Sequence, residues 1–187
     1  VVPNAANTDV VWSHFEQAAA GFDVSVRNQT LRTALIAVQG PRTVEVLSGL
    51  VNEQQRPALV EMGYYACAPI TVAGIEALVA RTGYTGEDGF ELFVAWDQAA
   101  ALWAACAEAG EPFGLAPVGL AARDTLRLEA GMPLYGHELG LDTSPFAAGI
   151  GRIVALKTKD SFVGRDAFAA SQAAYADEAT AAALPQL

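Results

Sequence analysis

Residues 81–92 read RTGYTGEDGFEL. The run contains glycines and two adjacent acidic residues, and it lies between two segments rich in apolar and β-branched residues. This arrangement is typical of a turn between two strands. The run ends in Glu91, a carboxylate flanked by Phe90 and Leu92. The pattern therefore predicts that Tyr84 and Glu91 lie close together, beside backbone that only glycine adopts easily.

Glu91 is the first candidate for chemistry. Side chains alternate along a strand, so Glu91 shares one face with Phe93 and Ala95, and its apolar neighbours point to the other face. A carboxylate on a partly apolar face must find hydrogen-bond donors, and a ligand edge with two adjacent N–H groups would satisfy both oxygens. An arginine partner or solvent explains Glu91 equally well. The ring of Tyr84 is open to two interpretations as well, stacking on a flat ligand or ordinary packing.

The remaining pattern predicts an α+β fold, because the strands come in antiparallel pairs separated by helices. A Pro/Gly-rich stretch at 111–117 divides the chain into two regions, 1–115 and 116–187. The expected strands are 22–27, 34–38, 64–72, 75–81, 90–95 and 150–156; the expected helices are 7–20, a short one after 41, 97–109, 117–130 and 168–187.

Composition excludes several classes of function. The chain has 187 residues, 52% of them hydrophobic, and a net charge of −10, which disfavours a nucleic-acid partner. No apolar run reaches the roughly 20 residues of a membrane span, and no leader peptide is recognisable. Because the chain begins with Val1 and Val2, which look like the end of a strand, we expect the natural start to lie upstream. Cys67 and Cys106 lack paired spacing, which favours reduced, inert thiols in a cytoplasmic compartment.

The helix expected at 117–130 carries a second candidate, Arg123. Helical periodicity places it at the edge of a buried stripe, from which it could grip an anion, and places Arg127 beyond that edge. A pair with Asp124 or Glu129 is the alternative for Arg123, and Glu129 is expected to need an internal partner. The expected buried stripe consists of Val118, Ala121, Ala122, Thr125 and Leu128.

The two histidines point to no catalytic centre. His14 falls on the polar side of the first helix, and His137 lies in a loop beside Glu138 without a nucleophile. A structural hydrogen bond is therefore expected for His137. No metal site is expected, because no cluster of histidines and cysteines accompanies the acidic turn.

Four segments together resemble one family, the T protein of the glycine cleavage system, an aminomethyltransferase. They are VVPNAAN at 1–7, the run at 81–92, GLAARDTLRLEAG at 119–131, and SPF at 144–146 with GIG at 149–151. The GEDGFE form looks more like the glycine cleavage enzyme than like related demethylases or the folate domains of sarcosine-oxidising enzymes.

The resemblance implies a fold and a reaction. It implies an α+β folate-binding region with antiparallel sheets and packed helices, which a C-terminal β-barrel follows in the family. The implied reaction takes an aminomethyl group from the lipoyl arm of a carrier, the H protein, and passes its one-carbon unit to tetrahydrofolate with release of ammonia. Tetrahydrofolate is then a cosubstrate, and no metal is involved.

The resemblance also assigns residues to a folate site. Glu91 matches the acid that holds the amidine edge of the pterin, Tyr84 a tyrosine near the pterin, and Arg123 an arginine of the same pocket. Asn4 and Val2 match a strand end that lines the site, and Tyr64 is a looser match.

The chain departs from the family pattern in three places. The family's catalytic aspartate lies upstream of the segment that matches Val1, and the match ends near 165–167, so the first part of the fold and the barrel are missing. Arg152 stands where many relatives carry an aromatic residue. The chain thus resembles an internal fragment without a catalytic residue of its own, and we expect no turnover from it alone.

Other functions remain open at this point. A non-catalytic folate-binding module, or a related folate-dependent demethylase, would share the fold, although the non-catalytic relatives usually carry a different signature with a cysteine. An interaction domain with an acidic surface is a third possibility. If the chain meets a carrier protein, the candidates for a local basic patch are Arg27, Arg32, Arg42 and Arg56.

Overall fold

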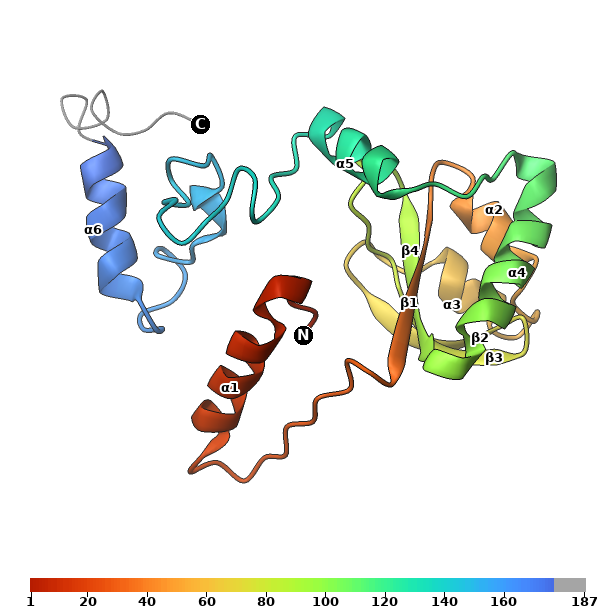
Figure 1. The fold of residues 1–187 in the computed structure, drawn as a ribbon, viewed down its shortest axis with the longest axis horizontal. Coiled ribbons are helices and arrows are strands. Elements are labelled where there is room, and N and C mark those ends of the chain that lie inside the picture. Colours follow the sequence, from red (N-terminus) through yellow and green to blue (C-terminus); the bar gives the residue numbers. More distant parts are fainter. Residues whose placement is uncertain (177–187) are drawn as a thin grey trace. The chain divides into compact units, whose positions relative to one another are not determined.

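Alternating apolar residues build a four-stranded antiparallel sheet, as shown in the computed structural model, which describes residues 1–176 (Figure 1). The strands lie in the order β1-β4-β3-β2, so β4 is central and pairs with both β1 and β3. The predicted α+β class is confirmed. The strands are β1 (Thr33–Gln39), β2 (Cys67–Val72), β3 (Ile75–Ala80) and β4 (Gly89–Ala95).

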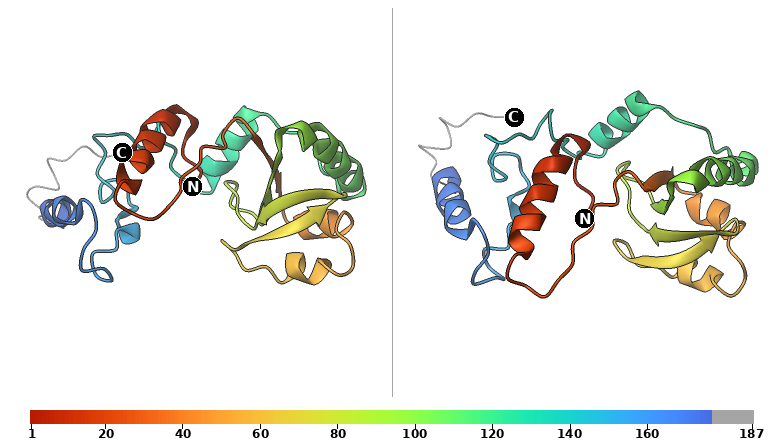
Figure 2. Two further views of the ribbon diagram at one scale, coloured as in Figure 1. Left: turned by 90° about the horizontal axis from the view of Figure 1, so that it is seen from below. Right: turned by 60° about the horizontal axis from the view of Figure 1, so that its bottom comes forward.

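Three helices cover one face of this sheet: α2 (Thr43–Ser48), α3 (Arg56–Val60) and α4 (Ala99–Gly110) (Figure 2). Every second residue of β4 points into this layer, where Phe90 and Leu92 are fully buried. Burial of the apolar face drives the association, because each of these side chains loses its contact with water. The helices contribute Val46, Leu47, Leu59, Leu102 and Cys106 to the core.

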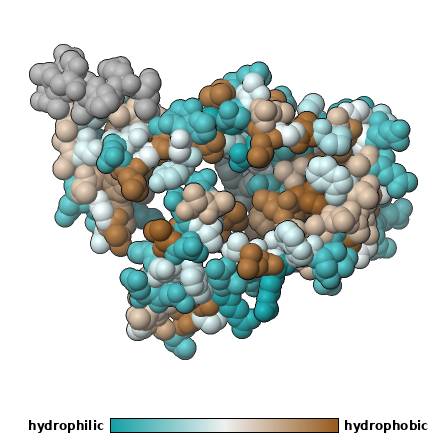
Figure 3. Space-filling model, viewed as in Figure 1, coloured by the Kyte–Doolittle hydropathy of each residue, from teal (hydrophilic) through white to brown (hydrophobic). Residues whose placement is uncertain are grey.

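Within residues 1–132, no helix packs on the centre of the opposite face of the sheet, and apolar side chains lie there. Leu35 of β1 lies opposite Phe93 of β4, which lies opposite Leu78 of β3, so the three form one row across the strands. Leu35 and Leu78 are 43% and 47% exposed. In Figure 3, hydrophobic atoms gather over β1 and β4. We call this surface the open face; Glu91 lies on it, one row away from Phe93.

Most of the expected helices are present, with shifts at their starts. Helix α1 (Thr8–Ala19) follows a short 3-10 turn, η1 (Ala5–Asn7), and buries no side chain. The helix expected from Pro117 begins later, as α5 (Leu120–Glu129). Asp97 does not cap α4; it lies in the turn η2 (Trp96–Gln98), so the helix starts after it. A further turn, η3 (Glu111–Phe113), follows α4.

The strand expected at 22–27 is wrong. These residues form bends and irregular chain, and Phe22 and Val24 are 73% and 61% exposed. An alternating pattern becomes a strand only where a neighbouring strand supplies hydrogen bonds and a packed layer covers the apolar side chains. Within residues 1–176 this segment has neither a pairing strand nor a covering layer.

The chain divides into two compact units between Met132 and Pro133. The division expected near residue 115 was of another kind, between two regions of one folate-binding domain, and it stays a prediction. None of the helices in the described part of the chain combines the length and apolar character that crossing a bilayer requires.

The second unit contains irregular chain, the 3-10 turn η4 (Gly151–Ile153) and α6 (Arg165–Ala176). The strand expected at 150–156 is wrong, because local hydrogen bonds from Ile150 to Pro145 and from Ile153 to Ile150 wind the backbone into turns. Helix α6 begins three residues before the expected start at Phe168. The rest of that expected helix, 177–187, lies outside the described residues.

The two faces of the sheet make a testable contrast. Leu92→Ala, in the core, is expected to lower the free energy of unfolding by about 2–5 kcal/mol, because it leaves a cavity among packed side chains. Leu35→Ala, on the open face, is the matched control and should lower it by less than about 1 kcal/mol. Urea denaturation followed by circular dichroism measures both, and equal losses would contradict this assignment of the two faces.

Candidate functional site

The segment between β3 and β4, residues 81–88, forms a loop whose two ends are clamped together; we call it the glycine loop. The guanidinium of Arg81 donates from Nε and NH2 to the two carboxylate oxygens of Asp88, at 2.9 and 2.7 Å. Both side chains are partly buried. The backbone of Asp88 is fixed as well, because its carbonyl accepts from the N–H of Gly40 at 2.8 Å. The clamp therefore sets the width of the loop and joins it to the end of β1.

Arg81 also ties the loop to the helical layer. Its NH1 donates to the carbonyls of Val60 and Met62, at 3.2 and 2.8 Å, and its guanidinium lies 5.3 Å from the centre of the Phe90 ring. The hydrogen bonds from Arg81 lower the pKa of Asp88, and those to Asp88 raise the pKa of Arg81. Both groups stay charged at neutral pH, which keeps the loop closed.

Glu91 follows the loop on the open face, between Ala37 of β1 and Ala80 of β3. Its alternation with buried neighbours confirms the predicted strand face. One carboxylate oxygen accepts a hydrogen bond from the hydroxyl of Thr82. No lysine or arginine of residues 1–176 forms an ion pair with Glu91, so the expected alternative of an arginine partner does not hold there. A half-buried carboxylate is thus held in place by a neutral group and keeps acceptor capacity for a donor from outside.

Tyr84, in the loop, lies against α5. The guanidinium of Arg123 lies 4.8 Å from the centre of its ring, a cation–π arrangement, and its hydroxyl donates to the carbonyl of Met132 at 3.4 Å. The loop backbone approaches α5 closely at Gly86, where φ is +77° and an added Cβ would lie 2.7 Å from the Cβ of Ala130. The structure therefore brings Tyr84 and Arg123 together, and the place in a folate pocket that the resemblance gives them stays a prediction.

The buried residue of α5 is Arg127, and the apolar stripe expected on this helix is not buried. Arg127 is 1% exposed and donates to Asp124 at 2.8 Å and to the carbonyl of Met132 at 3.2 Å. A guanidinium can be buried where acceptors of fixed geometry surround it, and here its own helix and the following turn supply them. Asp124 is consequently the partner of Arg127 and not of Arg123, and Glu129 is exposed. Of the expected stripe, Ala122 is half-buried and Val118, Ala121, Thr125 and Leu128 are exposed.

The other residues expected in the folate site have less defined surroundings. Tyr64 packs on Tyr65 with ring centres 4.2 Å apart, and desolvation, followed by the hydrogen bond to Tyr65, raises the pKa of Tyr64. Val2 and Asn4 lie before η1 with exposed side chains, and the carbonyl of Asn4 accepts from the N–H of Asn7. Within residues 1–176, no hydrogen bond or ion pair joins Val2 or Asn4 to Glu91. The roles of these residues stay predictions.

Within residues 1–176, the histidines and cysteines form no second catalytic cluster. His14 is exposed on α1, and Glu138 accepts a hydrogen bond from the N–H of Leu134 at 2.9 Å. Residues 1–176 contain no group of histidine, cysteine and acidic residues that could hold a metal ion. Cys67 and Cys106 are free thiols, and burial raises the pKa of Cys106 to about 11, which makes it unreactive.

The arginines expected to form a basic patch differ in their surroundings. Arg42 makes a bidentate pair with Glu45, at 2.9 and 2.7 Å, and lies 4.5 Å from the centre of the Phe113 ring. Arg56 donates to the carbonyl of Ser48, while Arg27 and Arg32 are exposed. Glu45 therefore offsets the charge of Arg42. Of the four arginines, Arg27, Arg32 and Arg56 remain the candidates for a basic patch.

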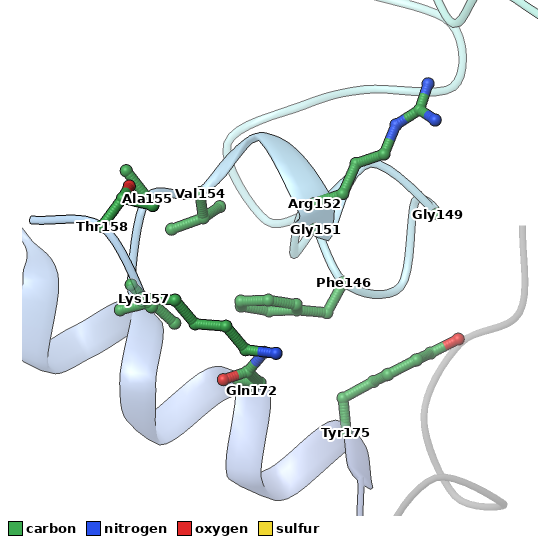
Figure 4. A pocket seen from close by; sticks show the side chains of 11 residues that line it. Phe146, Gly149, Gly151, Arg152, Val154, Ala155, Lys157, Thr158, Gln172 and Tyr175 are labelled. Atoms are coloured by element: carbon green, nitrogen blue, oxygen red, sulfur yellow. The ribbon is translucent and has the colours of Figure 1, made fainter.

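The second unit has a hollow of about 500 Å³ between η4 and α6 (Figure 4). Phe146 forms its buried wall, and Lys157, Gln172 and Tyr175 surround the opening with exposed side chains. In Figure 4 the guanidinium of Arg152 points away from this hollow. Because each of these polar side chains is exposed to solvent, the described residues give this hollow none of the fixed polar groups that Glu91 and the glycine loop present.

The chain matches a known family of transferase domains. The profile of the family described as the GCVT N-terminal domain matches residues 1–158. This match covers far more than half of the chain and includes the whole sheet, the glycine loop and α5. The chain belongs to the GCVT N-terminal domain family.

Individual relatives agree with this family and are named as a particular class of enzyme, the aminomethyltransferases. The aminomethyltransferase of Streptomyces avermitilis is 54% identical over 167 residues, which make up 89% of this chain and 44% of the relative. That of Corynebacterium aurimucosum is 51% identical over 166 residues, or 89% of this chain and 45% of the relative. The predicted resemblance to aminomethyltransferases is confirmed.

A solved structure supports the fold. The crystal structure of glycine cleavage system aminomethyltransferase T from Bartonella henselae superimposes with a TM-score of 0.71 and 31% sequence identity, over 91% of this chain and 44% of that chain. The chain therefore spans less than half of the length of these relatives. The predicted fold, part of the T-protein fold with an antiparallel sheet and packed helices, is confirmed.

The clamp of the glycine loop predicts a pH-dependent stability. Asp88 has a lower pKa in the folded chain than its ordinary value of 3.8, so the pair stabilises the fold above that value, and this contribution is lost as the pH falls through the lower folded pKa. Asp88→Asn should therefore lower the urea midpoint near pH 7, and the difference from the unsubstituted chain should shrink below about pH 4.

Glu108→Gln provides the control, because Glu108 is exposed on α4 and forms no ion pair in the described part of the chain. It should leave the midpoint unchanged within error across the same pH range. A difference between the unsubstituted chain and Asp88→Asn that stays constant with pH would show that the ion pair does not stabilise the loop.

Proposed function

We propose that this chain is the folate-binding part of an aminomethyltransferase of glycine cleavage. The proposed reaction transfers the one-carbon unit of an aminomethyl group from a dihydrolipoyl carrier protein to tetrahydrofolate and releases ammonia. Membership of the family supports the reaction class, and Glu91 supports the ligand. The observation that carries the proposal is a half-buried carboxylate on the open face that has no cationic partner in the described part of the chain.

The chemistry of a pterin fits such a carboxylate. A pterin ring presents an amino group and a ring N–H side by side, and these two donors match the spacing of two carboxylate oxygens. Such a charge-assisted pair contributes about 1.5–3 kcal/mol. The hydroxyl of Thr82 fixes one oxygen of Glu91, and this limits the rotation of the carboxylate before a ligand arrives.

The glycine loop supplies the aromatic side of the proposed site. In the structure, Arg123 lies over the ring of Tyr84, which keeps the ring from turning freely. In the proposed site, Tyr84 stacks against the flat ring of the pterin and Arg123 contributes positive charge beside it. Asn4, Val2 and Tyr64 are proposed to line the same site.

The reacting groups are proposed to come from elsewhere in the whole protein. The resemblance places the catalytic aspartate upstream of Val1, and the chain spans 44% of the Streptomyces avermitilis relative. The partner is proposed to be the lipoyl H protein, and tetrahydrofolate is a cosubstrate in a cytoplasmic setting without a metal. In this proposal the residues of this chain bind and orient the folate and do not move the proton or the carbon.

Substitution of Glu91 tests the proposed site in the full-length protein that contains this chain. Glu91→Gln keeps the shape and removes the charge, so the dissociation constant of tetrahydrofolate should rise by about tenfold or more. Glu76→Gln is the matched control, because Glu76 is an exposed carboxylate on strand β3. Isothermal titration measures both, and equal affinities for the two variants would exclude Glu91 from the folate site.

The 187-residue chain alone is expected to show no transfer from an aminomethylated carrier to tetrahydrofolate. The reason is that the carboxylate assigned to the reaction is absent, and positioning of the folate alone does not supply it. The measurement is the formation of methylenetetrahydrofolate, with the full-length protein as the positive control. Turnover by the isolated chain would show that one of its own residues is catalytic.

A further inference from the structure

Gln39, the last residue of β1, lies across the glycine loop. It pairs with Gly89 in the sheet, and its half-buried side chain extends toward both ends of the loop. Its Nε2 donates to the carbonyls of Thr82 and Phe90, at 3.1 and 3.4 Å. Its Oε1 accepts from the hydroxyl of Thr85 at 3.2 Å. One side chain therefore contacts the loop near its start and in its middle, and also contacts β4 at the second residue after the loop.

The amide of Gln39 uses its full set of donors with these contacts. Both N–H groups of Nε2 have a carbonyl acceptor, and Oε1 has a donor. A glutamine side chain that joins a backbone carbonyl of the loop to a backbone carbonyl of β4 restrains the loop much as a backbone pairing does, because it holds the start of the loop against the strand that follows it.

Two glycines make room for this side chain. An added Cβ at Gly83 would lie 1.8 Å from Oε1 of Gln39, and one at Gly89 would lie 2.3 Å from its Cδ. Neither distance is compatible with a real side chain. The presence of glycine at positions 83 and 89 therefore has two causes: the conformation of the turn, and the close packing of the Gln39 side chain against both residues.

We propose that Gln39 is a positioning residue for the folate site, an inference that rests on the function proposed above. Gln39 holds the carbonyl of Thr82, and the hydroxyl of Thr82 donates to Glu91. Gln39 also holds Thr85, the neighbour of Tyr84. The side chain thus fixes the direction of the Glu91 carboxylate on one side and the location of the Tyr84 ring on the other.

Gln39→Met tests this inference, because methionine has a similar length and volume but forms none of these hydrogen bonds. In the full-length protein the dissociation constant of tetrahydrofolate should rise by about tenfold, whereas kcat at saturating tetrahydrofolate should change by less than about twofold. A substitution that acted only by destabilising the whole fold would not raise the dissociation constant while leaving kcat nearly unchanged. Gln54→Met, at an exposed glutamine in a turn, is the control and should leave both unchanged.

Limited digestion gives a readout that does not need folate. Glu87 is exposed within the loop, so a glutamate-specific protease should cut after it faster in Gln39→Met than in Gln54→Met. Cleavage after Glu108, on α4, is the internal reference and should not change. Thr85→Val removes the hydroxyl that donates to Gln39, but the same hydroxyl accepts from the N–H of Glu87 at 3.5 Å, so faster cleavage after Glu87 in this variant does not report on Gln39 alone. If Gln39→Met does not fold, the decisive measurement is therefore the dissociation constant of tetrahydrofolate for Thr85→Val, which should rise by less than that expected for Gln39→Met.

The outcomes separate this inference from the proposed function. If Glu91→Gln weakens folate binding but Gln39→Met and Thr85→Val alter neither binding nor cleavage after Glu87, the positioning role is wrong. If Gln39→Met speeds cleavage while neither it nor Glu91→Gln affects folate binding, the folate site itself is wrong, and with it the role of Gln39 in that site. Faster cleavage together with weaker binding supports both.

Discussion

The bidentate pair between Arg81 and Asp88 holds together the part of the molecule on which the candidate site depends. It joins the first residue of the glycine loop to the last, so the ends of β3 and β4 that flank the loop are held in a fixed register. Arg81 extends this restraint to the carbonyls of Val60 and Met62 behind the sheet. An ion pair that is partly buried and surrounded by further acceptors resists solvent better than one on an open surface. The geometry of Glu91 and Tyr84 follows from this closure.

Around the clamp, the loop uses its short polar side chains for restraint. The hydroxyls of Thr82 and Thr85 reach Glu91 and Gln39, and the ring of Tyr84 reaches Arg123. Each contact is weak alone, but together they reduce the number of conformations that the loop samples. A site that is ordered before its ligand arrives loses less conformational entropy on binding.

The sequence predicted the sheet and the faces of β4 because strand periodicity is a local property: Glu91 and Leu92 must point in opposite directions once the segment is extended. The resemblance also assigned Tyr84 and Arg123 to one folate pocket; the structure places the two side chains in contact, and their role in such a pocket stays a prediction. The burial of Arg127 was not predicted, since helical periodicity counts an arginine as polar. The spacing of Asp124 and Arg127, one turn apart, is the signal that would have indicated a self-contained pair.

The wrong strands have a different origin, because strand formation depends on partners that lie elsewhere. Residues 22–27 alternate as β4 does, but in the described part of the chain no strand is present to pair with them. Residues 150–156 are rich in β-branched side chains, yet local hydrogen bonds that begin at Pro145 wind them into turns. The contacts of Gln39 belong to the same class: they join residues 43 to 51 positions apart, which no local pattern reveals.

The distribution of the two thiols gives the open face an experimental use. Cys106 is buried and its pKa is raised, whereas Cys67 is exposed at the start of β2. Cys67 lies opposite Ala80, which in turn lies opposite Glu91, so the three residues form one row across the sheet. A thiol-reactive fluorophore would therefore attach selectively at a point two strands away from Glu91. The native chain already contains the attachment point for an optical sensor of whatever approaches the open face.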